Sequence, residues 1–160
     1  MATFKETFLN IFIFIKYSAS EILREKRVCV YWGTGVVELK CSRCGLCCHD
    51  TEMLLSSRDI ARIEALGYKR EEFVVITPDG FRQLRNVDGK CFFFRGECMV
   101  YDSRPEGCVY YPVILNFDGK TCIVDEECPN HHTLTKKEIR ESCKKLKKLY
   151  REIVKEAKGT

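Results

Sequence analysis

The sequence lacks most of the motifs that usually announce a function. It has no phosphate-binding glycine loop, no dinucleotide-binding fingerprint and no arrangement of Ser, His and Asp typical of a hydrolase. Gly33-Thr34-Gly35 is the turn of an expected hairpin between strands 28–32 and 36–39. Only one Gln and four Asn occur among 160 residues rich in Lys and Glu, a bias typical of thermophiles. The absence of the motifs named above disfavours the common nucleotide-binding and hydrolytic classes.

Long apolar runs are also missing. The longest is Phe8–Ile15, eight residues that include Asn10, whereas a membrane-spanning helix needs about 20. Lys5 and Glu6 before this run do not form the basic start of a secretory signal. We expect a buried helix, or a strand, with docking to a partner or a membrane surface as the alternative. The chain is expected in the cytoplasm, without a transmembrane segment.

Cysteine, in contrast, is abundant, with eleven in the chain and four of them within residues 41–48. Two residues between successive cysteines let their sulfurs turn toward one soft metal ion, and Gly45 permits the necessary backbone reversal. Thiolates at this density select zinc or an iron–sulfur cluster. Disulfide pairing is the less favoured alternative, because it needs an oxidising compartment or a hyperthermophilic host.

Four further cysteines lie beside turn or loop signals. Cys91 and Cys98 bracket a short expected hairpin, Cys108 follows an expected turn, and Cys128 precedes Pro129. The candidate metal ligands are therefore Cys41, Cys44, Cys47, Cys48, Cys91, Cys98, Cys108 and Cys128. Eight thiols could form two four-thiolate sites, or one cluster and a separate redox-active or structural set.

The spacing leaves the metal open. Structural zinc usually takes two cysteine pairs, for which Cys41/Cys44 and Cys91/Cys98 would serve. A 4Fe–4S cluster is often held by three cysteines in C-x2-C-x2-C spacing and a remote Cys-Pro, here Cys128-Pro129. The adjacent Cys47 and Cys48 fit neither pattern. We favour the iron–sulfur cluster and keep zinc as the alternative.

The remaining three cysteines lie on apolar segments. Cys29 falls in the expected strand 28–32, and Cys143 lies on the apolar face of the expected C-terminal helix. Cys122 lies opposite Leu115 in an expected hairpin of strands 113–117 and 120–124 around Asp118-Gly119. We expect all three to be small core residues, apart from the eight candidate ligands, with a ligand role as the alternative for Cys122.

The compound pattern of these motifs resembles the YkgJ-type cysteine-cluster family. It comprises the 41–48 cluster, Cys91-x6-Cys98-x2-Tyr101-x2-Arg104-Pro105-x2-Cys108-x3-Pro112, and Cys128-Pro129. The resemblance covers roughly residues 38–155 and implies a zinc- or iron-chelating domain that uses the same eight cysteines. Flagellin lysine methylases are similar in this motif, which implies a possible methyl-transfer chemistry, but they are larger than this chain.

Other candidate site residues are few. Arg104, between two candidate ligands, could pair with the charge of a bound cluster, hold a substrate carboxylate or stabilise its own turn. His49, His131 and His132 are expected in turns or at the surface, although each lies close enough in sequence to support a ligand.

We expect a single small α+β domain with helices at both ends and cysteine-bearing hairpins and loops between them. Capping boxes predict helices after Ser56 and after Thr135, the first with Ile60, Ile63 and Leu66 on one buried face. The expected division is an N-terminal segment 1–27, a metal-binding core 28–133 and a basic helix 134–160.

Residues 134–160 hold ten Lys or Arg against four Glu. The main hypothesis is therefore an iron–sulfur or zinc protein with a redox or group-transfer role, acting on an unknown small molecule or protein. The alternative is a non-enzymatic zinc module that binds a protein through the basic helix, with nucleic acid a less favoured partner.

Overall fold

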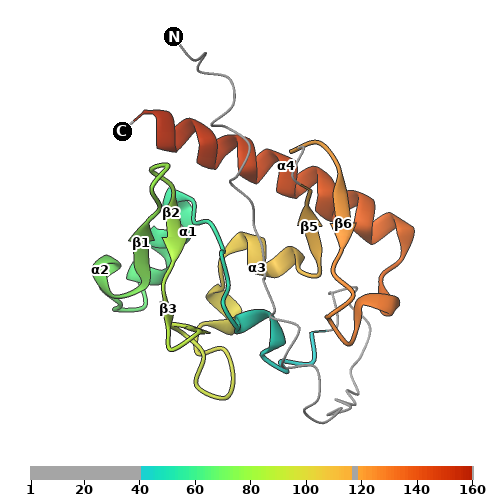
Figure 1. The fold of residues 1–160 in the computed structure, drawn as a ribbon, viewed down its shortest axis with the longest axis horizontal. Helices are drawn as coiled ribbons and strands as arrows, with labels where there is room; N and C mark the ends of the chain where they lie inside the picture. Colours follow the sequence, from blue (N-terminus) through green and yellow to red (C-terminus); the bar gives the residue numbers. More distant parts are fainter. Residues whose placement is uncertain (1–40, 117–118, 160) are drawn as a thin grey trace.

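The computed structural model describes residues 41–116 and 119–159, which form a small α+β domain of helices and antiparallel strand pairs (Figure 1). The expectations for Phe8–Ile15, for strands 28–32 and 36–39 and for Cys29 lie outside the described residues. The elements, in chain order, are α1 (Ser57–Glu64), α2 (Arg70–Phe73), β1 (Val74–Ile76), β2 (Arg82–Leu84), β3 (Asn86–Val87), β4 (Lys90–Cys91), α3 (Glu106–Tyr110), β5 (Val113–Leu115), β6 (Cys122–Val124) and α4 (Lys136–Lys158).

Helix α1 begins at the predicted capping box. Ser56 accepts a hydrogen bond from the Asp59 amide, and the Asp59 carboxylate accepts one from the Ser56 amide. Ile60 and Ile63 are fully buried, as their spacing predicts. Leu66, expected on the same face, is 51% exposed because the helix already ends at Glu64.

Three short hairpins follow one another along the chain. Strands β1 and β2 are joined by the turn at Gly80, and β3 and β4 by Asp88-Gly89, where both turn residues have positive φ. Strand β5 pairs with β6, and the predicted partners Leu115 and Cys122 lie opposite each other. These two strands are shorter than the predicted runs 113–117 and 120–124, and residues 117–118 between them are not described.

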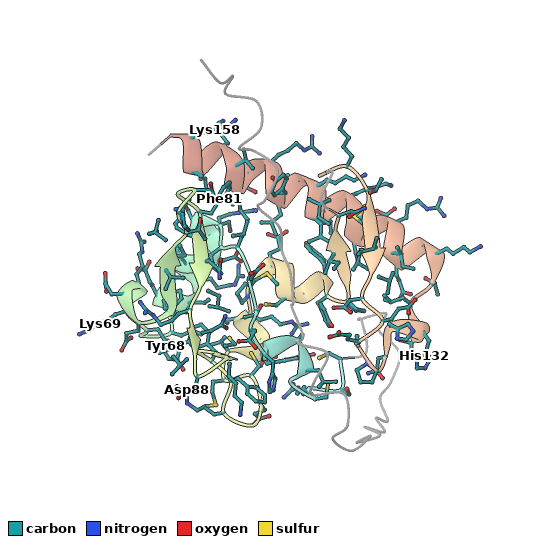
Figure 2. The ribbon with its side chains drawn as sticks, viewed as in Figure 1. Tyr68, Lys69, Phe81, Asp88, His132 and Lys158 are labelled. Carbon is teal, nitrogen blue, oxygen red and sulfur yellow. A yellow bond between two sulfur atoms is a disulfide. The ribbon has the colours of Figure 1, made fainter. Side chains whose placement is uncertain are left out.

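The longest element is α4, which crosses the domain and lies over β5, β6 and α3 (Figure 1). Its predicted cap is present, with Thr135 accepting from the Glu138 amide at 3.2 Å. Leu149 and Ile153 pack against Phe81, which lies at the tip of the β1–β2 hairpin (Figure 2). Within the described residues no helix is long and apolar enough to cross a membrane.

The expectation that Cys122 and Cys143 only pack is wrong, because the two form a disulfide (Figure 2). Their Cα atoms are 5.8 Å apart, within the range that a disulfide requires. Cys122 on β6 and Cys143 on α4 are 21 residues apart, so only the packing of α4 on this hairpin brings them together.

Two hydrophobic clusters hold the domain. The smaller joins Leu54 and Phe81 to α4. The larger lies beneath α1 and the first hairpins and contains Met53, Leu55, Ile60, Ile63, Phe73, Val74, Leu84, Cys91, Phe93 and Val100. A buried thiol belongs to this larger cluster, which therefore forms one wall of the site described next.

Candidate metal centre

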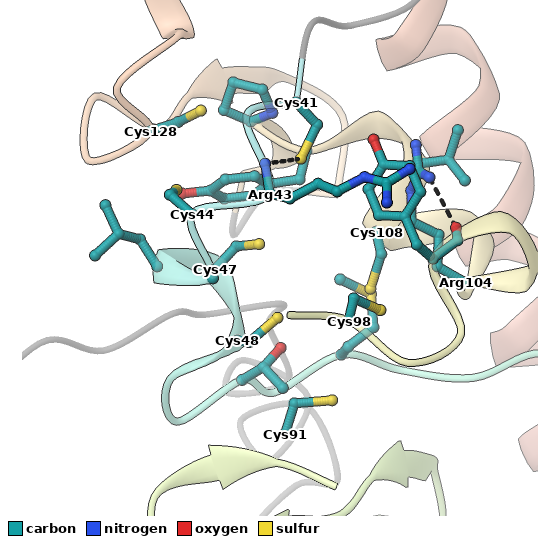
Figure 3. Close-up of a pocket in the computed structure, with 18 of the residues that line it drawn as sticks. Cys41, Arg43, Cys44, Cys47, Cys48, Cys91, Cys98, Arg104, Cys108 and Cys128 are labelled. Atoms are coloured by element: carbon teal, nitrogen blue, oxygen red, sulfur yellow. Dashed lines mark hydrogen bonds between the residues drawn. The ribbon is translucent and has the colours of Figure 1, made fainter. Parts of the chain in front are cut away.

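Eight cysteines, all unpaired, line a single cavity with a volume of about 90 Å³ (Figure 3). They are Cys41, Cys44, Cys47, Cys48, Cys91, Cys98, Cys108 and Cys128, the full set proposed from the sequence. They come from the loop 41–48, from β4 and the turn after it, from α3 and from the loop before α4. Arg104 lines the same cavity.

The loop 41–48 is shaped by Gly45. This residue has φ +78°, and a side chain here would collide with the ring of Phe94. The Gly45 carbonyl accepts a hydrogen bond from the Cys48 amide at 2.9 Å, which closes a tight turn around Leu46–Cys48. Earlier in the loop, the Arg43 amide donates to Cys41 Sγ at 3.4 Å. This contact holds the Cys41 sulfur against the backbone of its own loop.

Backbone pairing brings Cys48 beside Cys91. His49 forms an antiparallel bridge with Lys90, and the Asp50 amide donates to the Gly89 carbonyl at 2.8 Å. This bridge brings their chain neighbours Cys48 and Cys91 close together. After Cys91 the chain turns back, and Phe94 forms a bridge with Cys98, as the hairpin expected between the two cysteines requires.

Cys108 lies within α3 rather than in a loop, directly after the turn formed by Arg104 and Pro105. The buried Asp59 carboxylate of α1 fixes this helix start, because it accepts a hydrogen bond from the Glu106 amide at 2.9 Å. Asp59 also pairs with Arg62, whose guanidinium donates to the carbonyls of Ser103 and Arg104. The capping box of α1 thus holds the segment that carries Arg104 and Cys108.

Cys128 is presented by a loop anchored on Asp125. The Asp125 carboxylate accepts hydrogen bonds from the Tyr111 hydroxyl at 2.9 Å and from the Glu127 amide at 3.0 Å. Burial, followed by the charge of Asp125, raises the pKa of Tyr111, so this tyrosine stays protonated and keeps donating. The loop is therefore held against the residues that follow α3.

The thiols strongly influence one another. The close contacts of Cys48 with Cys47 and with Cys91 lower the pKa of Cys47 and of Cys91 and raise the pKa of Cys48. Burial raises the pKa of Cys98 and of Cys108, and raises that of Cys128 to about 11. A bound cation would replace these protons and compensate the thiolate charge that the mainly apolar walls disfavour.

Two arginines stack on one aromatic ring at the edge of the cavity. The guanidinium carbons of Arg43 and Arg104 each lie 4.0 Å from the centroid of the Tyr101 ring. Arg104 also donates to the Tyr101 carbonyl at 2.8 Å, and its charge contributes to the lowered pKa of Cys47. The positive charge is thus fixed beside the thiols. Sequence reasoning found Arg104 but missed Arg43, although Arg43 lies between two candidate ligands.

The three histidines, all among the described residues, do not line the cavity. His49 packs against Phe94, and the ring nitrogen Nδ1 of His131 lies 2.8 Å from the Cys128 carbonyl oxygen. His132 is exposed at the edge of the domain (Figure 2). The short helical turn that holds His131 and His132 agrees with the expectation, whereas His49 is half-buried in a β-bridge.

The donor set suits a thiolate-bound metal. Within residues 41–116 and 119–159, no three His, Cys, Asp or Glu side chains already stand in a metal-binding arrangement. The eight thiols nevertheless share one cavity, and none of them is used in a disulfide. Zinc and iron–sulfur clusters are the centres that such a donor set selects.

A cavity walled by unpaired thiols places this domain among cysteine-rich metal chelators. Residues 40–144 match the model of the CxxCxxCC family, described as a putative zinc- or iron-chelating domain. Because the match spans well over half of the chain, the chain belongs to this family, and that membership supports metal binding. No curated protein and no solved structure shows a significant match to this chain.

Proposed function

We propose that this chain is an iron–sulfur protein that uses the cavity cysteines as ligands and has a redox role. The observation that carries the proposal is the separation of the cysteines into two chemical fates. Eight unpaired thiols converge on one cavity, whereas the other two described cysteines form a disulfide elsewhere. Thiols so close together would be prone to pair with one another if no metal occupied them.

We prefer iron–sulfur to zinc because of the cysteines around the exposed Cys41 of the cavity. Cys41, Cys44 and Cys47 have the spacing of a 4Fe–4S ligand triplet. Cys128, which precedes Pro129, lines the same cavity and would serve as the remote fourth ligand. When bound, such a cluster supplies a one-electron redox couple. Zinc has no redox chemistry, so a zinc-only protein would have a structural or Lewis-acid role instead.

The protein's own residues adjust such a centre. Arg43 and Arg104 place two positive charges next to the thiols. Positive charge stabilises the reduced, more negative state of a cluster and raises its reduction potential. The same guanidinium groups suit a substrate carboxylate, which would be their task in a group-transfer reaction.

We place the protein in the cytoplasm of a thermophile. A reducing compartment keeps the eight cavity thiols available for metal. Intracellular proteins of hyperthermophiles also carry disulfides, so the Cys122–Cys143 bond is compatible with this location.

Anaerobic purification followed by metal and acid-labile sulfide analysis tests the proposal. Brown protein with broad absorbance near ~400 nm, iron and equivalent sulfide is the expected result. Colourless protein that holds zinc without sulfide would overturn the iron–sulfur assignment. Protein that holds neither metal after anaerobic preparation and reconstitution would overturn metal binding as a whole.

The basic helix supports a second candidate, a module that binds an acidic protein partner through α4. Glu152 and Glu156 of α4 face inward, where they pair with Arg58 and Arg82. The outward face is left with exposed basic residues, namely Lys136, Lys137, Arg140, Lys144, Lys145, Lys148, Arg151, Lys155 and Lys158. Figure 2 shows Lys158 at the end of this helix, directed away from the domain.

Fluorescence anisotropy with a labelled poly-glutamate peptide tests this second candidate. Binding should weaken when Lys137, Lys144 and Lys148 are replaced by Gln, and should fall steeply with added salt. Lys69, Lys90 and Arg95, which lie on other elements, provide a control triple substitution of equal charge. Equal binding by both triple variants would remove any specific role of α4. A labelled DNA duplex in the same assay tests the less favoured nucleic-acid partner.

A further inference from the structure

Eight thiols are twice the number that one common thiolate centre uses. A structural zinc ion takes about four ligands, and a 4Fe–4S cluster likewise takes about four cysteines. A single centre would therefore leave four unpaired thiols beside it. Whether those four thiols also bind a metal follows from where they lie relative to the hydrophobic core. This inference rests on the proposed function.

Four of the thiols belong to the larger hydrophobic cluster. Cys91 is a buried member, and Cys48, Cys98 and Cys108 pack against it. The other four, Cys41, Cys44, Cys47 and Cys128, are not part of this cluster, and Cys41 is exposed. The boundary between the two groups falls between the adjacent residues Cys47 and Cys48. Cys48 packs against the hydrophobic cluster, and Cys47 does not belong to it.

The positions of the thiols divide in the same way. Figure 3 shows Cys128 on the side of Cys41 and Cys44, and Cys91 and Cys98 on the side of Cys48. The bridge between His49 and Lys90 holds Cys48 beside Cys91, and the bridge between Phe94 and Cys98 turns the chain back after Cys91.

We propose that the cavity holds two four-thiolate centres, divided between Cys47 and Cys48. The outer centre uses Cys41, Cys44, Cys47 and Cys128 and takes the 4Fe–4S cluster. The inner centre uses Cys48, Cys91, Cys98 and Cys108 and takes zinc. The adjacent cysteines that fit neither known spacing are explained by this division, because each serves a different centre.

The two centres differ in surroundings and hence in role. The inner thiols pack against the hydrophobic cluster that contains Met53, Phe93 and Val100, so a metal there would tie the ligand loops to the core and stabilise the fold. The outer thiols adjoin Arg43 and Tyr101 and include the exposed Cys41, so a cluster there can exchange electrons with a partner. Redox function is thereby assigned to the outer centre alone.

Metal stoichiometry in single variants tests the division. Wild-type protein prepared anaerobically should contain iron, sulfide and zinc in a ratio of about 4:4:1. Cys44→Ser should lose at least 80% of the iron, the sulfide and the visible absorbance, yet retain zinc at the wild-type level. Cys98→Ser should lose zinc and, because the core is opened, melt at a lower temperature than Cys44→Ser.

Cys44→Ser is the decisive variant because its side chain lies outside the hydrophobic cluster and its folding can be checked by circular dichroism. The control is Cys143→Ser, which removes a cysteine remote from the cavity and should leave all three ratios unchanged. X-ray absorption at the zinc edge should show a shell of about four sulfurs near 2.3 Å, in Cys44→Ser as in wild type.

Parallel loss of iron and zinc in a folded Cys44→Ser variant would overturn the division and indicate one shared centre. Wild-type protein that contains a cluster but no zinc would also overturn it, while leaving the proposed iron–sulfur function intact. Wild-type protein without iron and sulfide would instead contradict the proposed function itself.

Discussion

Two regions of this domain use cysteine in opposite ways. In the cavity, eight thiols remain unpaired and surround a common space. Beneath α4, Cys122 and Cys143 are oxidised to a disulfide that ties β6 to the helix. The residue type is cysteine in both regions, so the difference arises from how many other cysteines lie near each one. One partner across a strand–helix contact permits a disulfide, whereas many partners around a cavity suit a metal.

The supports of the two regions also differ. The cavity depends on polar anchoring of its loops, through Asp59 for the segment before Cys108 and through Asp125 for the loop of Cys128. The disulfide lies on regular elements whose register and helical face already place the two Cα atoms close together. The cavity should therefore be damaged by changes that leave the disulfide region intact, and the converse should also hold.

The largest expected effect is the loss of the Asp59 carboxylate. Asp59→Ala leaves the amides of Ser56 and Glu106 without their acceptor and removes the partner of Arg62. Breaking such a buried, charged network should lower the free energy of unfolding by about 4 kcal/mol. Urea unfolding measures this loss, and metal content should fall as well.

The control for Asp59 is Glu141→Gln, which removes an exposed ion pair with Lys144. It should leave both stability and metal content at wild-type values. A fully stable, metal-loaded Asp59→Ala variant would show that α1 does not position the Cys108 segment.

A smaller loss of stability is expected when the glycine in the turn of the loop 41–48 is replaced by alanine. Gly45→Ala places a methyl group at positive φ and against the Phe94 ring, at a combined cost of about 3 kcal/mol. Gly96→Ala is a matched control, because Gly96 also has positive φ but nothing lies within 4 Å of an added Cβ. It should cost about 1 kcal/mol. Equal thermal stability of the two variants would contradict the role assigned to Gly45.

Removal of the disulfide tests the other side of the comparison. The double substitution Cys122→Ser and Cys143→Ser releases a loop with a sequence separation of 21 and should cost about 2 to 3 kcal/mol through unfolded-state entropy. Metal content and the visible spectrum should stay unchanged, because neither sulfur lines the cavity. Loss of the chromophore in a folded double variant would mean that the two regions are not independent.

The smallest expected effect concerns the potential of the cluster. Arg104→Gln removes one of two positive charges beside the thiols and should lower the reduction potential, with little change in metal content. Arg70→Gln, an exposed residue paired with Glu64 away from the cavity, should leave the potential unchanged. Electrochemical titration measures the reduction potential of both variants. An identical potential for the two would show that the charge of Arg104 does not act on the cluster.

Local signals in the sequence predicted much of this fold. The capping boxes at Ser56 and Thr135 and the pairing of Leu115 with Cys122 are confirmed, because each depends on residues close in the chain. The disulfide was missed, since it depends on how α4 packs on a hairpin. The exposure of Leu66 was missed because periodicity does not show where a helix ends.

The candidate ligands were proposed from their spacing and their turns, and the structure brings all eight to one cavity. What the spacing could not give is the division into inner and outer groups, which follows from tertiary packing against the core. The contact of Asp59 with Glu106 was likewise beyond the sequence, because the two residues are 47 positions apart.

Differential alkylation under anaerobic conditions tests the central claim that the eight cavity thiols are metal ligands. Loaded protein is treated with a thiol reagent before and after metal removal by a chelator, without reductant, and each cysteine is followed by mass spectrometry. The eight cavity cysteines should be protected in the loaded protein and modified after metal removal, while Cys122 and Cys143 stay unmodified in both states. Equal modification of the cavity cysteines with and without the chelator would contradict the claim.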